Sequence, residues 1–123
     1  MAEARTTIAV VPRESYSVVP SMLETLLAHT PPPRRIVVVD GGSPAHLRRR
    51  LERLASASDF TFVHRDAVVT GNEARNLAMS HVSTPYVCFV DNDTFVDDGW
   101  LERLERCADE TGASLVSAAV LWG

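Results

Sequence analysis

The sequence predicts an α/β fold of the Rossmann-like kind, in which three layers place helices on both faces of a mostly parallel sheet. Two observations predict it. Apolar runs that suit short strands alternate along the chain with stretches of helical hydrophobic spacing. The runs at 36–39 and 86–90 also lack the polar alternation of a half-exposed strand, which is typical of strands buried on both faces. We expect one domain over residues 1–123.

The first half of the chain is expected to contain two strand–helix units. An apolar run at 7–11 ends at Pro12, and a helix follows until the prolines at 31–33 stop it. The second strand, expected at 36–39, leads into a turn with two glycines. There Ser43 is expected to be the N-cap of the next helix, because a proline follows it at the first helical position.

The second half repeats the pattern. Strands are expected at 60–63, 86–90 and 114–121. The run at 86–90 has five apolar residues without alternation, so we expect it in the middle of the sheet. The N-caps expected for the intervening helices are Asn72, and Asp97 or Asp98.

Two carboxylates follow the fourth predicted strand, in the sequence Asp91-Asn92-Asp93. Strand geometry predicts that Asp91 and Asp93 point to the same side of the chain. Like charges so close repel each other unless a cation lies between them, and oxygen ligands suit Mg²⁺ or Mn²⁺. The pattern therefore predicts a metal site that also holds a diphosphate. The alternative is an Asp-rich turn that leads into the next helix.

Polar residues also follow the other strands, and in an open parallel sheet ligands bind outside the carboxyl ends of the strands. Asp40 is expected to accept hydrogen bonds from the base or ribose of a nucleotide, or else to belong only to a strand-to-helix turn. Arg75 lies about one turn into a predicted helix, where it can clamp phosphate oxygens. The alternative for Arg75 is a solvated side chain that pairs with a nearby acid.

Composition excludes several classes of function. All twelve basic residues are arginine, so a phosphate-binding loop with lysine, a Schiff base and a receiver-like phosphate acceptor are excluded. A net charge of −4 argues against nucleic acid as a partner. No apolar run is long enough for a membrane span, and we expect no transmembrane segment. Two isolated cysteines favour a cytoplasmic setting.

These motifs together resemble a known family. The order is a short strand ending at Pro12, then Val37-Val38-Val39-Asp40-Gly41-Gly42-Ser43, then Gly71-Asn72-Glu73-Ala74-Arg75-Asn76, then Val90-Asp91-Asn92-Asp93. This order is similar to the nucleotide-sugar-binding half of the family 2 inverting glycosyltransferases, which have the GT-A fold. The resemblance implies a metal-dependent site for a nucleotide-diphosphate sugar.

The resemblance also implies a role for each matching residue. Asp93 would ligate the metal that bridges the diphosphate, and Asp91 and Asn92 would lie beside it near the ribose or sugar. Asp40 would lie near the nucleoside, and Arg75 near the phosphates. The wall of the base pocket would come from Pro12, Arg13 and Glu14.

The chain departs from the family pattern at two positions. Arg13-Glu14 replaces a polar-aromatic pair of the Tyr-Asn kind, and Gly41 replaces a second acid that reads uracil. The base of the nucleotide therefore stays open.

No residue matches the general base that an inverting transfer requires, and we expect the domain to be truncated at its C-terminus. An incomplete sheet would leave an exposed edge, through which the chain could form a homo-oligomer. A non-catalytic α/β interaction or assembly module is therefore the alternative to a donor-binding portion of a transferase with an unknown acceptor.

Overall fold

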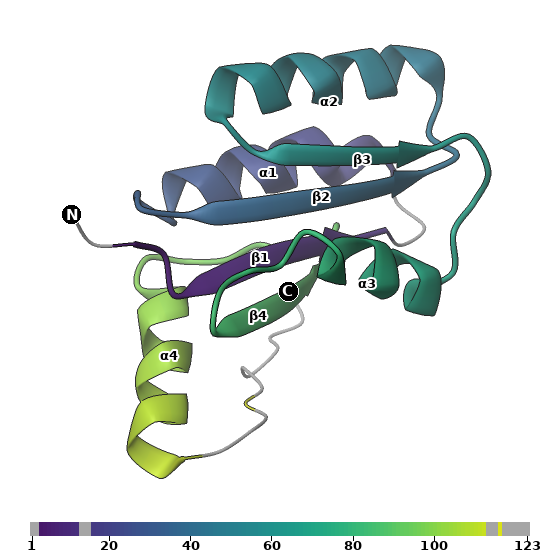
Figure 1. Ribbon diagram of the computed structural model, residues 1–123. Helices are drawn as coiled ribbons and strands as arrows, with labels where there is room; N and C mark the ends of the chain where they lie inside the picture. The colour runs from purple at the N-terminus through teal and green to yellow at the C-terminus, as the bar shows by residue number, and fades with distance from the viewer. Residues whose placement is uncertain (1–2, 13–15, 113–115, 117–123) are drawn as a thin grey trace.

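The protein is described by a computed structural model, which covers residues 3–12, 16–112 and 116. In this part of the chain, four strands form one sheet in the order β3-β2-β1-β4. Their bounds are β1 Thr6–Val11, β2 Arg35–Gly41, β3 Thr61–Arg65 and β4 Tyr86–Asp91. Every pairing is parallel, and Figure 1 shows the strand arrows running the same way. The predicted parallel α/β fold is confirmed.

The helices lie on both faces of the sheet (Figure 1). Their bounds are η1 Tyr16–Val18, α1 Val19–Ala28, α2 Ala45–Ser58, α3 Gly71–Met79 and α4 Trp100–Thr111. Side chains of α1, α2 and α4 pack with Ile8, Val38 and Val90 in one hydrophobic cluster. On the other face, α3 contributes Ala74 and Ala78 to a smaller cluster. The three-layer arrangement follows from strands that are apolar on both faces.

The inner strands of the described sheet are β1 and β2, and β4 lies at its edge. All six residues of β1 are buried, whereas in β4 only Val90 is buried. Phe89 is 41% exposed and shares a register position with Ala9 of β1. The expectation that the fourth strand occupies the middle of the sheet is wrong for the described residues. The fifth strand expected at 114–121 lies outside them, apart from residue 116.

The N-caps predicted for three helices (Ser43, Asn72, and Asp97 or Asp98) are wrong, because other residues occupy the N-cap positions. Pro44 occupies the N-cap position of α2, and Gly99 occupies that of α4 in the left-handed conformation. Thr70 caps α3: its hydroxyl accepts from the Glu73 amide at 3.2 Å and lies 3.1 Å from the Glu73 carboxylate. The Thr-x-x-Glu spacing is that of a capping box and is readable in the sequence, and the bond from the Glu73 amide to the Thr70 hydroxyl is its first half.

The edge at which the strands begin is held together by α4. Arg5 at the start of β1 makes two hydrogen bonds to the carboxylate of Asp109, at 3.0 and 2.6 Å. Thr6 donates to Glu105 at 2.6 Å. Trp100 donates its indole N–H to the buried hydroxyl of Thr30 at 2.9 Å. These contacts hold α4 against the amino ends of the strands.

No helix among the described residues is long and apolar enough to cross a membrane. The two cysteines form no disulfide in this part of the chain. Burial, with the charge of Glu105 as a smaller cause, raises the pKa of the Cys88 thiol to about 11. The cytoplasmic setting stays a prediction.

Candidate functional site

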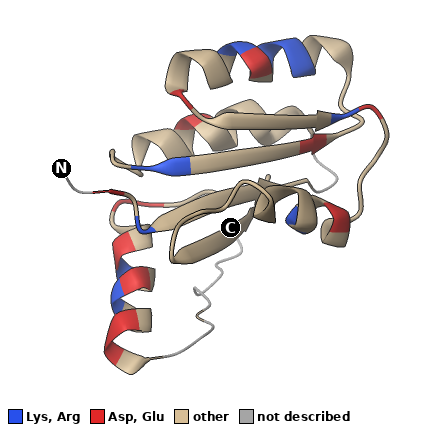
Figure 2. Cartoon of the chain, in the orientation of Figure 1, with Lys and Arg blue, Asp and Glu red and all other residues tan. Residues whose placement is uncertain are grey.

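The candidate site lies where the strands end, which we call the exit edge. The register places Val11 beside Asp91, Asp40 beside His64 and Gly41 beside Arg65. Figure 2 shows charged residues at the ends of β2 and β3, in the loop after β3 and in the first turns of α3. Parallel pairing therefore brings together residues that are up to 80 positions apart in sequence.

Asp40 is the most enclosed acid of this edge, with an exposed fraction of only 5%. Its Oδ2 atom accepts from the Ser43 hydroxyl at 2.5 Å and lies 2.7 Å from Nδ1 of His64. The Ser43 hydroxyl, expected as a helix cap, serves instead to hold Asp40. Within the described residues, Oδ1 of Asp40 has no hydrogen-bond partner. One oxygen of the carboxylate is therefore fixed by the protein and the other can accept a hydrogen bond from a ligand.

Gly41 explains one departure from the family pattern. A Cβ atom at this position would lie 2.7 Å from the Val69 backbone nitrogen and 3.0 Å from the Ala67 carbonyl oxygen. Both neighbours are backbone atoms of the loop between β3 and α3, so they cannot move aside as a flexible side chain would. The carbonyl of Gly41 also accepts from the Tyr16 hydroxyl at 2.8 Å. An acidic side chain therefore does not fit here while that loop keeps this path.

The Asp91-Asn92-Asp93 segment begins at the last residue of β4. The strand ends at Asp91, and Asp93 belongs to the following turn, in which the Thr94 amide donates to the Asp91 carbonyl at 3.1 Å. Strand alternation therefore covers Asp91 but does not extend to Asp93. Asp91 is half-buried and interacts with another residue, while Asp93 is exposed.

Asn92 is buried, with an exposed fraction of 4%. Its amide nitrogen in the backbone donates to the Val11 carbonyl at 3.0 Å, which extends the ladder between β1 and β4 by one bond. Its side-chain Oδ1 is buried and has no hydrogen-bond partner among the described residues. An unpaired buried acceptor costs free energy. A ligand that donates a hydrogen bond here would remove that cost.

The side-chain oxygens of Asp91, Asn92 and Asp93 are of the type that binds Mg²⁺ or Mn²⁺, but they do not form a complete protein cage for the ion. No group of three or more His, Cys, Asp or Glu side chains in the described residues is placed to hold a metal ion. Mg²⁺, however, is usually bound by one or two carboxylates together with water and substrate phosphates, rather than by a complete protein cage. Two carboxylates and an unpaired amide oxygen fit that shared kind of site.

Arg75 lies in α3, whose N-terminus is at the exit edge (Figure 1). The side chain is exposed, and its guanidinium donates to the Asn72 side-chain oxygen at 2.7 Å. The guanidinium also lies over Gly71, where a Cβ atom would be 3.5 Å from it. Arg75 is therefore folded back over the first turn of the helix, with its charge near the positive end of the helix dipole.

The predicted wall of the base pocket is described only in part. Pro12 follows β1 and is half-buried, whereas Arg13 and Glu14 lie outside the described residues. Tyr16, just after that gap, packs against the larger hydrophobic cluster and bonds to Gly41. Tyr16 thus connects η1 to the end of β2, beside Asp40.

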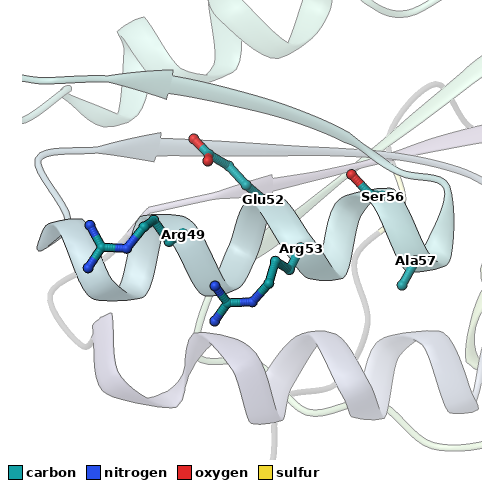
Figure 3. Close-up of a pocket in the computed structure, with 5 residues that line it drawn as sticks. All are labelled: Arg49, Glu52, Arg53, Ser56 and Ala57. Atoms are coloured by element: carbon teal, nitrogen blue, oxygen red, sulfur yellow. The ribbon is translucent and has the colours of Figure 1, made fainter.

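A separate, open pocket lies on the outer surface of α2 (Figure 3). Its lining residues are Arg49, Glu52, Arg53, Ser56 and Ala57. It contains no residue of the exit edge and is formed by a single helix. We therefore place the candidate site at the strand ends, where polar groups from several elements converge.

His64 is the site residue that sequence reasoning missed. The sequence analysis assigns it no role, yet its ring lies between two carboxylates: Nδ1 is 2.7 Å from Asp40 Oδ2, and Nε2 is 3.1 Å from Asp66 Oδ1. The signal was available: strands adjacent in sequence usually pair, so two polar residues at the ends of consecutive strands become neighbours.

The family model for glycosyl transferase family 2 matches residues 7–122. The chain belongs to this family. No curated protein sequence matched the chain. The resemblance seen in the order of the motifs is confirmed.

Solved structures with the same fold include three of TarS from S. aureus. The crystal structure of TarS 1-349 superposes with a TM-score of 0.71 and 20% sequence identity, over 89% of this chain and 33% of that one. For the crystal structure of TarS, the TM-score is 0.70 and the sequence identity is 21%, over 87% of this chain and 20% of that one. For the complex of TarS 1-349 with UDP, the TM-score is 0.71 and the sequence identity is 20%, over 89% of this chain and 33% of that one. The chain thus spans a third or less of these proteins, and the likeness shows the fold.

Proposed function

We propose that this family 2 glycosyltransferase chain binds a nucleotide-diphosphate sugar at the exit edge, as the donor for transfer to an acceptor. The observation that carries the proposal is the convergence of Asp40, Asp91 and Asn92 on one edge of a parallel sheet in a chain of this family. The UDP complex of TarS, a protein of the same fold, supports a nucleotide as the ligand.

The proposed orientation follows the order of the strands. Asp40 in β2 offers a free carboxylate oxygen to the nucleoside, and Tyr16 and Pro12 lie beside it. The diphosphate then lies near β4 and the first turn of α3, where Arg75 can leave Asn72 and turn to phosphate oxygens. The N-terminus of α3 adds a favourable dipole for the same anion.

Asp91 and Asp93 would hold Mg²⁺ or Mn²⁺ together with the diphosphate oxygens. When bound, such an ion supplies positive charge that neutralises the diphosphate. In this proposal, the Asn92 side-chain oxygen accepts a hydrogen bond from the sugar or from metal-bound water. Each of these groups acts on the donor alone, and the acceptor and the general base are not assigned.

The test is calorimetric titration of the full chain with UDP-, GDP- and dTDP-glucose, with and without MnCl₂. We expect one of them to bind in the presence of metal, and Asp93→Ala to weaken that binding by about tenfold or more. Glu110→Gln, at an exposed acid in the last turn of α4, is the matched control and should bind as the natural chain does. Absence of binding for all three donors would overturn the proposal.

A second candidate function is the non-catalytic assembly module. It is favoured by the outer edge of β4, where Phe89 is 41% exposed and no described strand pairs. An unpaired strand with an exposed aromatic residue can pair with a second copy of the chain. Light scattering on the natural chain and on Phe89→Ser tests this. A dimer that Phe89→Ser dissociates, without donor binding, would favour the module.

A further inference from the structure

We propose that the end of β2 selects a donor with uracil or thymine as its base and rejects guanine. Asp40 makes the selection, because Ser43 and His64 occupy one of its two carboxylate oxygens and leave a single oxygen for the base. Ser43 and His64 are thus positioning residues that act through Asp40. The inference rests on the proposed function, since it takes Asp40 to contact the nucleoside, and it adds the class of base to that function.

The Oδ2 atom of Asp40 has no capacity left for a ligand. It accepts from the Ser43 hydroxyl at 2.5 Å, and Nδ1 of His64 lies 2.7 Å from it. A carboxylate can only accept, so this contact requires a proton on Nδ1, which the neutral ring can carry as well as the imidazolium. A carboxylate oxygen has two lone pairs, and these two donors use both of them.

The Oδ1 atom is the oxygen that is left for a ligand. It has no hydrogen-bond partner within the described residues. The Asp40 side chain is only 6% exposed. Even so, Oδ1 does not belong to the fully buried side-chain atoms that lack a partner in the described part of the chain. It therefore reaches the surface, and a ligand that covers it must donate a hydrogen bond or leave a carboxylate oxygen unpaired.

The residue after Asp40 adds no second acid. Gly41 has no side chain, and a Cβ atom there would lie 2.7 Å from the Val69 backbone nitrogen. Its carbonyl oxygen already accepts from the Tyr16 hydroxyl at 2.8 Å. The end of β2 therefore offers a ligand one charged acceptor atom that is not already in use.

The spacing of the strands places the base, rather than the ribose, at Asp40. Val10 of β1 pairs with both Val38 of β2 and Val90 of β4. Asp40 and Asn92, each two residues further along, therefore lie at the same level on either side of β1. Strands two places apart in a sheet are about 10 Å apart. With the diphosphate near β4, the part of the nucleotide that reaches β2 is the part farthest from the phosphates, which is the base.

The number of N–H groups on the base then decides the affinity. Guanine has two adjacent N–H groups, at N1 and N2, and a carboxylate with two free oxygens accepts such a pair in a bidentate way. Uracil and thymine have a single ring N–H, at N3. At Asp40, guanine finds only Oδ1 for its two donors, so one N–H is poorly satisfied when it is buried. We expect that loss to weaken binding by about tenfold or more.

The measurement is calorimetric titration of the full chain with UDP-, dTDP- and GDP-glucose in the presence of MnCl₂. We expect UDP- and dTDP-glucose to bind with similar affinity, and GDP-glucose to bind about tenfold or more weakly. GDP-glucose that binds as tightly as UDP-glucose would overturn the inference and leave the proposed function intact. A preference for UDP- over dTDP-glucose that Asp40→Ala removes would place the ribose 2′-hydroxyl at Asp40, and it would also overturn the inference.

Variants of the two positioning residues separate selection from a merely structural role. Ser43→Ala, alone and together with His64→Phe, removes donors from Oδ2, and phenylalanine keeps a ring that can stack on Phe62. The preference for UDP- over GDP-glucose should fall by about tenfold in the double variant and by less in Ser43→Ala. Ser43→Thr and His64→Asn each keep a donor toward Oδ2 and should keep the preference.

The control is His46→Gln, at an exposed histidine in the first turn of α2, which should bind all three donors as the natural chain does. Thermal melts show whether each variant is folded. A structural role alone would weaken the three donors by the same factor. A preference that stays unchanged in both Ser43→Ala and the double variant would therefore contradict the inference.

Nitrogen NMR of the histidine rings tests the arrangement without any ligand. Nδ1 of His64 should carry a proton in the natural chain, and Asp40→Ala should change the signal of that hydrogen-bonded group. A His64 ring that carries its proton only on Nε2 would overturn the inference even if donors bind. If Nδ1 is protonated but none of the three donors binds, the proposed function fails, and the selection of the base fails with it.

Discussion

The two edges of the sheet use polar groups in opposite ways. At the amino ends of the strands, polar groups pair with one another: Arg5 with Asp109, Thr6 with Glu105, and Trp100 with Thr30. At the exit edge, acceptors are left over, since Asn92 Oδ1 has no partner among the described residues and Asp40 uses one oxygen only. The edge at the amino ends of the strands therefore stabilises the fold, whereas the exit edge has acceptor atoms that a ligand can use.

Gly41→Ala should have the largest effect, because it acts on both stability and binding at the exit edge. The new Cβ atom would lie 2.7 Å from the Val69 backbone nitrogen, so β2 or the loop after β3 must shift. We expect a loss of about 2–3 kcal/mol in the free energy of unfolding, as for overpacking in a core, together with weaker donor binding. Urea denaturation and calorimetric titration measure the two effects.

The matched control is Gly71→Ala in the first turn of α3. Its Cβ atom would meet only the Arg75 guanidinium, at 3.5 Å, which is an ordinary contact. Its free energy of unfolding should stay within about 0.5 kcal/mol of the natural value. Equal effects of the two substitutions would show that the loop does not constrain Gly41.

Trp100→Phe should have the next largest effect, confined to stability. It removes the indole N–H and leaves the buried hydroxyl of Thr30 without that donor. We expect a loss of about 1–3 kcal/mol in the free energy of unfolding, with donor affinity unchanged. A double-mutant cycle with Thr30→Val isolates the hydrogen bond from the change in ring volume. A coupling energy near zero would contradict the role given to this contact.

Asp109→Asn should have the smallest effect on stability, and the size of this effect should depend on pH. The hydrogen bond from Arg5, followed by that from Tyr86, lowers the pKa of the Asp109 carboxyl. A lowered pKa means that the stabilisation is present above the unfolded pKa of about 3.9 and is lost as the pH falls through the folded value.

The lowered pKa of Asp109 predicts how the melting temperatures of the two chains compare. The natural chain should melt slightly above Asp109→Asn at neutral pH, and the two curves should converge in acid. Thermal melts from about pH 2 to pH 7 measure the difference. A difference that persists at the lowest pH would mean that the carboxylate charge is not its cause.

The sequence predicts the layers of the fold well, whereas the roles of the candidate site residues stay predictions. The apolar runs at 7–11, 36–39, 60–63 and 86–90 predict four strands, which pair in parallel, and the residues after them form the exit edge. The N-caps were less predictable, because Ser43, Asn72 and Asp97 all suit a cap by type. Which residue caps a helix depends on the path of the chain. The Ser43 hydroxyl donates to Asp40 instead of capping α2, and the Thr70 hydroxyl, rather than the Asn72 side chain, accepts the amide hydrogen bond that caps α3.

Two features of the site needed the three-dimensional structure. Consecutive strands are expected to pair, but which residue lies beside Asp40 depends on the register of β2 with β3, which no local pattern fixes. The need for glycine at position 41 depends on how closely the loop after β3 approaches. Both are contacts between residues more than twenty positions apart, where residue type alone predicts little.

The most direct test of the central claim uses Mn²⁺ as a paramagnetic probe of the two edges. Amide NMR signals broaden near bound Mn²⁺, so spectra recorded with MnCl₂ and UDP-, GDP- or dTDP-glucose locate the ion. The account predicts that signals of Asp91, Asn92, Asp93 and the first turn of α3 broaden when metal and donor are present together. Broadening centred on the acids of α4 at the other edge, or the same in Asp93→Ala, would contradict it.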